Sequence, residues 1–384
     1  MPPPVYLDHA ATTPVREEVL EAMMPFFGPK FGNPSSTHRW GRDARTALDE
    51  ARERVAACLG AAADEVCFTS GGTEADNLAV LGGWRILKAR GRNAIVTTPI
   101  EHKAVLESVH KAAAEGADER FLDVSEAGMV SVDDARAKFT DDVALASVMW
   151  VNNEVGSVQP VPELAALAKE RGIVFHTDAV QAFGKVDVNA RVVPFDFVSI
   201  SGHKIGAPTG IGAMFLRRGT PLEPLFFGGS QDRGRRPGTE NVASAVGFAA
   251  ACELAVRERE ANVARYARLR DRLEAGILAK VSDAIVNAKD AVRAPHILNV
   301  TVPGVDGESM LMALDLHGVA CSGGSACQSG SANPSHVLAA MHPRAGSGAS
   351  VRMSVGALND EASIDRAVEV FTKLALKARG MAVA

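Results

Sequence analysis

The chain has 384 residues and a formal net charge of −5, and 47% of its residues are hydrophobic and 23% charged. This length favours two domains, or one large domain with an appendage, over a single compact core. The composition is that of a globular protein, and the weak negative charge gives no electrostatic reason to expect nucleic acid or an anionic membrane as a partner.

Short β-branched segments alternate with longer helical patterns through the first two thirds of the chain. Strands are predicted at residues 66–69, 94–98, 144–151, 173–176, 195–200 and 211–216. Helical patterns lie between them, for example at residues 43–59, 73–89 and 161–171, and Gly60 and Gly172 close the first and the last of these. This alternation predicts an α/β domain with a mostly parallel, buried sheet sandwiched by helices.

The pattern changes from about residue 250. A long charged helix is predicted over residues 252–278, followed by scattered strands and two more helical stretches. We therefore predict a large domain at residues 15–255 and a smaller α+β domain formed by residues 1–14 and 256–384. A run of small residues, SGGSACQSGSAN, occupies positions 322–333 and predicts a mobile loop at about residues 321–333.

The cysteines and the lack of targeting patterns indicate a reducing compartment. The five cysteines are scattered and form no disulfide framework, which suits a reducing environment. The first residues lack the basic and then apolar pattern of a secretory signal, and no apolar run approaches the ~20 residues that span a bilayer. We expect a cytoplasmic protein with no membrane partner.

Lys204 lies in Ser201-Gly202-His203-Lys204, directly after the predicted strand 195–200. A lysine in these surroundings is suited to form a Schiff base with an aldehyde cofactor. Asp178 follows the predicted strand 173–176, where a carboxylate could keep a pyridinium protonated. Enzymes that use pyridoxal 5'-phosphate (PLP) need both groups. The pair predicts a PLP enzyme, whereas Asp178 taken alone would more simply cap the next helix.

Three more predicted strands are followed by polar residues that suit a cofactor. The turn that contains Gly72 and Thr73 opens a helix, so its backbone amides and the helix dipole could bind a phosphate. His102 could stack on a flat ring and relay protons, and Asn153 has the same placement after another strand. The simpler alternatives are a plain strand–helix turn with Thr73 as the N-cap, and a structural histidine.

Cys327 and Arg352 are the candidates in the second part of the chain. Cys327 has only small neighbours, as reactive cysteines often do, although the run could also be a plain linker. Cys321 and Cys327 could instead bind a metal with His317 and His336, but their spacing matches no compact zinc pattern and we predict no metal site. Arg352 could hold a substrate carboxylate or form an ordinary ion pair.

These residues lie in motifs that resemble the cysteine desulfurases of the NifS/IscS type, within the class V aminotransferase superfamily. The resemblance covers nearly the whole chain. Its motifs are YLDHAATTP (6–14), TSGGTEADN (69–77), EHKAV (101–105), VNNEVG (151–156), HTDAVQAFGK (176–185), SGHK (201–204), PGTEN (237–241), GSACQSG (324–330) and PSHVLAAM (334–341). It implies the fold of the type I PLP-dependent transferases.

The resemblance implies a role for each candidate in the cofactor site. Lys204 would carry the PLP Schiff base, Asp178 would pair with the pyridine nitrogen, and Gln181 would bind the ring oxygen. His102 would stack on the ring and assist proton transfer. The phosphate would be bound at the turn of Gly72 by Thr73, Ser201 and His203, and by Thr239 of the neighbouring subunit of a homodimer.

The same resemblance implies the substrate and the reaction. Asn153 and Arg352 would hold the carboxylate of L-cysteine, and the Cys327 thiolate would take its sulfur as a persulfide, releasing L-alanine. An acceptor such as an iron–sulfur scaffold would then receive the sulfur. Nitrogenase-dedicated and tRNA-thiolation acceptors, and a preference for selenocysteine, stay open. So do an aminotransferase or lyase of the same fold, which has no use for Cys327, and a silent metal-binding scaffold.

Overall fold

The computed structural model describes residues 3–323, 335–342 and 348–380. Its centre is a seven-stranded sheet in the order β2-β8-β7-β6-β5-β3-β4. The strands are β2 (Val66–Thr69), β3 (Ala94–Thr97), β4 (Asp118–Phe121), β5 (Val143–Ser147), β6 (Val174–Asp178), β7 (Phe197–Ser201) and β8 (Gly212–Leu216). Only β8 runs antiparallel to its neighbours, so the other six strands end at the same edge. The mostly parallel, buried sheet confirms the α/β prediction.

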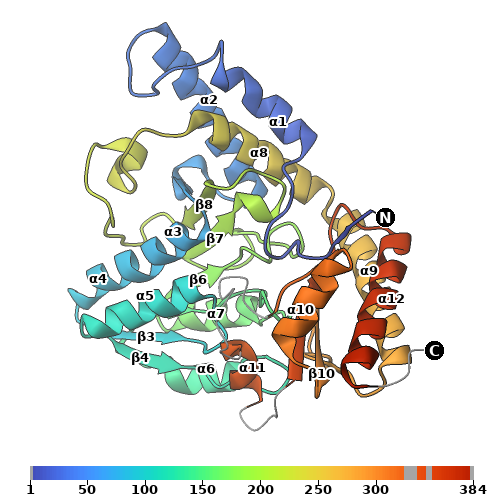
Figure 1. The fold of residues 1–384 in the computed structure, drawn as a ribbon. Coiled ribbons are helices and arrows are strands. Elements are labelled where there is room, and N and C mark those ends of the chain that lie inside the picture. The colour runs from blue at the N-terminus through green and yellow to red at the C-terminus, as the bar shows by residue number, and fades with distance from the viewer. Residues whose placement is uncertain (1–2, 324–334, 343–347, 381–384) are drawn as a thin grey trace.

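Helices cover both faces of this sheet (Figure 1). Buried side chains of α2 (Arg39–Cys58), α6 (Val132–Lys138), α7 (Val161–Glu170) and α8 (Val242–Arg257) share one hydrophobic cluster with the sheet. Those of α3 (Gly72–Asn77), α4 (Gly83–Lys88) and α5 (Lys103–Ala114) share another, on the opposite face. Parallel strands are usually buried in this way, which is why they are rich in apolar residues.

A further hydrophobic cluster lies beside this sandwich and shares no residue with it. It is formed by α9 (Arg259–Lys280), α10 (Gly307–Leu316), α12 (Glu361–Ala378), β9 (Ile285–Val286), β10 (Ile297–Pro303), β11 (Val319–Ala320) and β12 (Gly348–Ser354). The strand β1 (Val5–Tyr6) pairs with β11, so both ends of the chain enter this cluster. The domain boundaries near residues 15 and 255 stay a prediction.

The long helix predicted over residues 252–278 is wrong, because two helices, α8 and α9, meet at Glu258. They pack in different places, α8 against α2 and α9 against α12, so a single straight helix could not serve both cores. The carboxylate of Glu258 receives hydrogen bonds from both terminal nitrogens of Arg16, at 2.6 and 3.1 Å. The chain therefore changes direction at Glu258. The N-terminal segment passes from one hydrophobic cluster to the other at the same place.

Two other predicted elements differ in detail. The helix predicted over residues 73–89 is α3 and α4 joined by a π-helical turn at Leu78–Gly82, and the strand predicted over residues 144–151 ends at Ser147.

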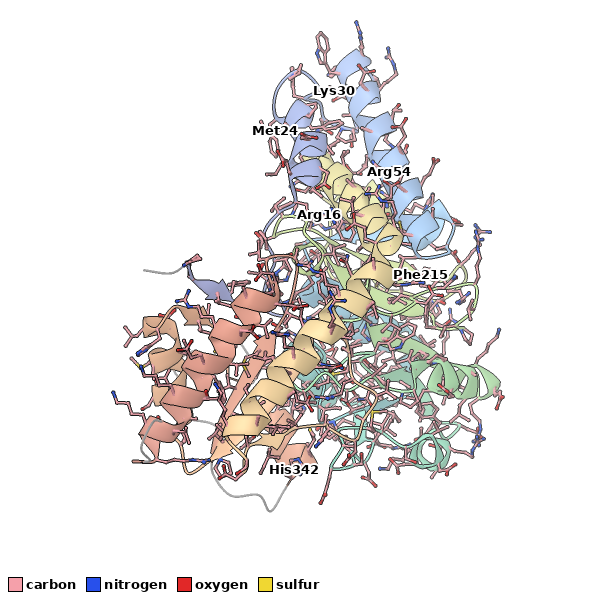
Figure 2. The ribbon with its side chains drawn as sticks, turned by 90° about the vertical axis from the view of Figure 1, so that its right-hand side faces the viewer. Arg16, Met24, Lys30, Arg54, Phe215 and His342 are labelled. Atoms are coloured by element: carbon pink, nitrogen blue, oxygen red, sulfur yellow. The ribbon has the colours of Figure 1, made fainter. Side chains whose placement is uncertain are left out.

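The helices α1 (Glu17–Met23) and α2, with Met24 and Lys30 between them, stand out from the sheet layers (Figure 2). Among the described helices, none combines the length and the apolar character that a membrane crossing requires.

We predict that a cavity in one hydrophobic core destabilises that core more than the other. Leu273 in α9 is fully buried in the second core, so Leu273→Ala should lower the free energy of unfolding by about 3 kcal/mol. Native-state hydrogen exchange should then speed up in β10 and β12 more than in β6 and β7. An equal loss of protection in all four strands would show instead that the cores unfold as one unit.

Candidate active site

The acidic end of the site lies where β6 ends. Asp178 is the last residue of β6, His102 precedes α5, and Asp76 lies in α3. One ligand atom of each of these three side chains lies within 4.8 Å of the others. The structure thus brings Asp178 and His102 together, as strands that end at one edge predict. Asp76 joins them without having been singled out in the sequence.

Burial decides the charge of the two carboxyl groups. It raises the pKa of both Asp76 and Asp178 to about 7, and for Asp178 the charge of the neighbouring Asp76 contributes to that rise. His176 lies 3.5 Å from Asp76, but burial lowers its pKa to about 4, so it is neutral and no counter-ion. Asp76 Oδ1 has no hydrogen-bond partner among the described residues. Two acids therefore share a site that would be stabilised by a cation.

His102 enters the site as a neutral ring. It is the N-cap of α5, and its Nδ1 accepts a hydrogen bond from the Ala104 amide at 3.1 Å. Burial also lowers its pKa. An acceptor at Nδ1 places the proton on Nε2, so the ring can lie against a flat cofactor without adding a charge.

Lys204 is held by the N-terminal segment rather than by the sheet. It lies in a short 3-10 turn after β7, and its Nζ donates to the carbonyls of Ala10 and Ala11 at 2.7 and 2.6 Å. A second lysine, Lys185, donates to the Lys204 carbonyl at 3.3 Å. Burial, and the charge of Lys204, lower the pKa of Lys185 to about 8. The neighbouring cation thus favours loss of a proton from the Lys185 amine.

Gln181 and His203 contact the same N-terminal segment. The amide of Gln181 donates to the Ala10 carbonyl at 2.8 Å, and its oxygen lies 3.1 Å from His296 Nε2. Both ends of this amide are thus engaged within the protein, and its contact with a ring oxygen stays a prediction. His203 lies 3.2 Å from the Thr12 hydroxyl, and its pKa falls to about 4 because it is partly buried near Lys204.

The glycine turn after β2 lies close to Ser201. A Cβ added to Gly72 would lie 2.7 Å from the Val180 side chain and 3.7 Å from Ser201 Cβ, so this close approach requires glycine. Thr73 is exposed in the first turn of α3. Thr239 lies in an open hollow that begins at the same turn and is lined by Ser70, Glu74, Phe227 and Arg236, among others. Thr73 and Ser201 thus lie at the turn, and their contact with a phosphate stays a prediction, as does that of Thr239 from the neighbouring subunit.

Arg352 and Asn153 meet on the other side of the site. Arg352 lies in β12 and is 2% exposed. Its Nη1 donates to the Asn153 carbonyl and its Nη2 to the Asp8 carboxylate, both at 2.9 Å. The structure thus joins these two predicted residues, together with an acid that the sequence analysis did not single out.

Cys327 lies outside the described residues, but the chain on either side of its segment is anchored at the site. Before the segment, the Ser322 hydroxyl donates to Asp8 at 2.7 Å. After it, His336 Nε2 lies 2.9 Å from the carbonyl of Glu101, the residue before His102. These two anchors place both neighbours of the segment 324–334 beside the predicted substrate and cofactor residues.

The four described cysteines are unsuited to nucleophilic attack. Burial raises the pKa of Cys58 to about 11 and that of Cys321 to about 12, and raises those of Cys67 and Cys252 as well. A thiolate, rather than a thiol, is the nucleophile. In addition, Cys321 belongs to no described group of side chains that could hold a metal, nor do His317 and His336.

The donor set fits PLP. Two adjacent buried acids of raised pKa match a protonated ring nitrogen, and Lys204 supplies an amine for the aldehyde. The sequence analysis missed Asp8, Asp76 and Lys185, although each lies within a quoted motif. Burial of a carboxylate or an ammonium group cannot be read from a motif, so the only signal was the charge of these side chains.

Comparisons with known proteins agree with this chemistry. The model of the family described as aminotransferase class-V matches residues 5–367. Cysteine desulfurase IscS of Dictyoglomus turgidum is 44% identical over 376 residues, which cover 98% of this chain and 95% of the relative. Cysteine desulfurase NifS of Azotobacter vinelandii is 45% identical, with 95% and 90% covered.

Solved structures of similar proteins share the fold. A protein described as NifS-like superposes with a TM-score of 0.90 at 34% identity, over 97% of this chain and 99% of the other. DndA from Streptomyces lividans superposes with a TM-score of 0.77 at 41% identity, over 91% of this chain and 99% of the other.

We predict that the buried acid pair makes the apoprotein less stable as the pH rises. A carboxyl group whose pKa is about 7 when folded and 3.8 when unfolded stabilises the fold at low pH, and this contribution is lost as the pH rises through 7. Asp76→Asn removes one such group and lowers the pKa of Asp178. In thermal melts, the variant apoprotein should gain stability relative to wild type at about pH 8, and gain less at about pH 5. Asp141→Asn, at an exposed carboxyl, is the control, and an equal shift at both pH values would contradict the prediction.

Proposed function

The chain belongs to the class-V aminotransferase family, and we propose that it is a PLP-dependent cysteine desulfurase. L-Cysteine would give up its sulfur to Cys327 and leave as L-alanine. The carbon–sulfur bond breaks as a sulfur–sulfur bond forms, and the thiol proton of Cys327 balances the one that the product carbon gains. The observation that carries this proposal is that His102 interacts electrostatically with both the buried acid Asp178 and Lys204, while the anchors of the Cys327 segment reach Asp8 and Glu101.

Each residue does a separate part of this work. When bound, PLP withdraws electrons from the α-carbon of an amino acid, which makes the α-proton acidic. Asp178 would keep the proton on the ring nitrogen, helped by the adjacent Asp76. Lys204 would bind the aldehyde and, once displaced by the substrate amine, move the α-proton as a general base. His102 would cover the ring and relay a proton through Nε2.

Arg352, Asn153 and Cys327 would act on the substrate. Arg352 and the side-chain amide of Asn153 would hold the carboxylate, which fixes the direction of the α-hydrogen. Cys327 would attack the substrate sulfur as a thiolate. The four described thiols have raised pKa values and cannot readily replace it.

We further infer a homodimer that passes its persulfide sulfur to an acceptor such as an iron–sulfur scaffold. The hollow that contains Thr239 is open, and Phe226 and Phe227 on its wall are 53% and 85% exposed. Exposed aromatic side chains next to a polar hollow favour a partner surface. The names of the relatives, IscS and NifS, support an acceptor in cluster assembly.

Removal of the nucleophile should separate cofactor binding from sulfur transfer. Cys327→Ala should keep the visible absorbance of bound PLP but form no alanine or sulfide from L-cysteine. Cys321→Ala is the matched control, since partial burial raises the pKa of its thiol to about 12, and it should keep wild-type turnover. Normal turnover by Cys327→Ala would rule out the proposed nucleophile.

Removal of the lysine should abolish covalent attachment. After borohydride reduction, the peptide that contains Lys204 should carry the mass of a phosphopyridoxyl group, and Lys204→Ala should carry none. Lys185→Ala is the control, because its amine lies beside Lys204 and is assigned no bond to the cofactor. A label on Lys185 in the wild type would overturn the assignment of Lys204.

A further inference from the structure

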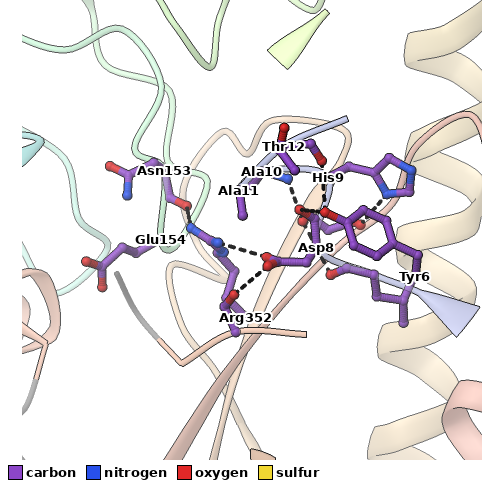
Figure 3. Close-up of polar contacts among 12 residues, drawn as sticks. Tyr6, Asp8, His9, Ala10, Ala11, Thr12, Asn153, Glu154 and Arg352 are labelled. Carbon is purple, nitrogen blue, oxygen red and sulfur yellow. Dashed lines mark hydrogen bonds and ion pairs between the residues drawn. The ribbon is translucent and has the colours of Figure 1, made fainter. Parts of the chain in front are cut away.

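A carboxylate from the N-terminal segment reaches the predicted substrate arginine. Figure 3 shows Asp8 between Arg352 on one side and Tyr6 and His9 on the other. Asp8 Oδ1 accepts from Arg352 Nη2 at 2.9 Å, and its Oδ2 accepts from the Ser322 hydroxyl at 2.7 Å. Ser322 and Arg352 also exchange backbone hydrogen bonds. One carboxylate therefore links the arginine to Ser322, two positions before the segment 324–334.

Arg352 keeps donors for a second carboxylate. A guanidinium has five N–H groups, and the contacts with Asp8 and with the Asn153 carbonyl use two of them. Its buried Nε has no hydrogen-bond partner among the described residues. An unsatisfied donor on a buried cation is costly, so this edge of Arg352 is suited to a ligand that accepts hydrogen bonds. Asp8 does not have to leave for such a ligand to bind.

Asp8 itself is fixed by the backbone around it. Its carbonyl accepts from the Ala11 amide at 2.9 Å and from the Tyr6 hydroxyl at 3.1 Å. The neighbouring Ala10 amide donates to the Ser354 hydroxyl at 2.8 Å, which ties the turn to β12. The same turn presents the carbonyls of Ala10 and Ala11 to Lys204. Asp8 is thus held from two directions and can hold Arg352 in turn.

We propose that Asp8 is a positioning residue for the substrate carboxylate: it fixes the guanidinium of Arg352 so that the unused donors face the substrate. This inference rests on the proposed function of Arg352. The competing view is that Asp8 occupies the arginine and that the substrate must displace it. The second hydrogen bond of Asp8, to Ser322, and the Nε of Arg352, which has no partner among the described residues, favour positioning.

The test compares two variants of Asp8 in the PLP-loaded enzyme. Asp8→Ala removes both hydrogen bonds, and should raise the KM for L-cysteine about tenfold or more while kcat changes less, because hydrogen bonds to charged groups are the strong ones. Asp8→Asn keeps an acceptor for Arg352 and should recover part of the loss. Asp283→Asn breaks an exposed ion pair with Arg379 in the same core, and should leave KM unchanged.

A second measurement tests whether the effect of Asp8→Ala depends on the carboxylate of the ligand. Calorimetric titration with L-alanine, which has a carboxylate, should show weaker binding to Asp8→Ala by a similar factor. Cysteamine, which lacks one, should inhibit the wild type and the variant equally. A lowered KM in both variants would show that Asp8 competes with the substrate, and an unchanged KM with a lower melting temperature would show a structural role only. Either result overturns the inference.

Arg352→Ala separates this inference from the proposed function. If that variant binds L-alanine as well as the wild type does, the assignment of Arg352 to the carboxylate is wrong. If it binds poorly while Asp8→Ala binds normally, the assignment stands and the role of Asp8 fails.

Discussion

The site depends on the burial of two acids side by side. Asp76 and Asp178 are removed from water at the end of the sheet, and the histidine nearest to Asp76 is neutral. Their pKa values of about 7 state the cost of ionising them there. A protein keeps such a pair when a ligand compensates it. The cationic ring nitrogen of PLP is that ligand in the proposed enzyme.

The basic side chains of the site are also grouped by charge. Lys185 and Lys204 lie together, and the pKa of Lys185 is lowered to about 8. Like charges are thus grouped, acids at one end and lysines nearby, whereas Arg352 is already neutralised by Asp8. In the proposed enzyme, the cationic ring nitrogen of PLP is complementary to the two buried acids.

Much of the fold and part of the site could be read from the sequence. Apolar strands that end in Thr73, His102, Asn153 and Asp178 predict one functional edge, because parallel strands end together. The break at Glu258 could not be predicted, since both flanking segments favour helix and only their packing in different cores separates them. Asp8 and Asp76 were missed for a related reason. Their partners are more than 100 positions away or on another element, and no local pattern reports such contacts.

The turn at residues 8–12 affects the distance between Arg352 and Lys204. One end of it holds Arg352 through Asp8, and the carbonyls of Ala10 and Ala11 hold Lys204. Arg352 belongs to the second core and Lys204 to the edge of the large sheet, so their separation would otherwise follow the orientation of the two bodies. Because one short peptide touches both, its length acts as a spacer of fixed size. The distance between the two side chains therefore depends on a few peptide bonds of this turn.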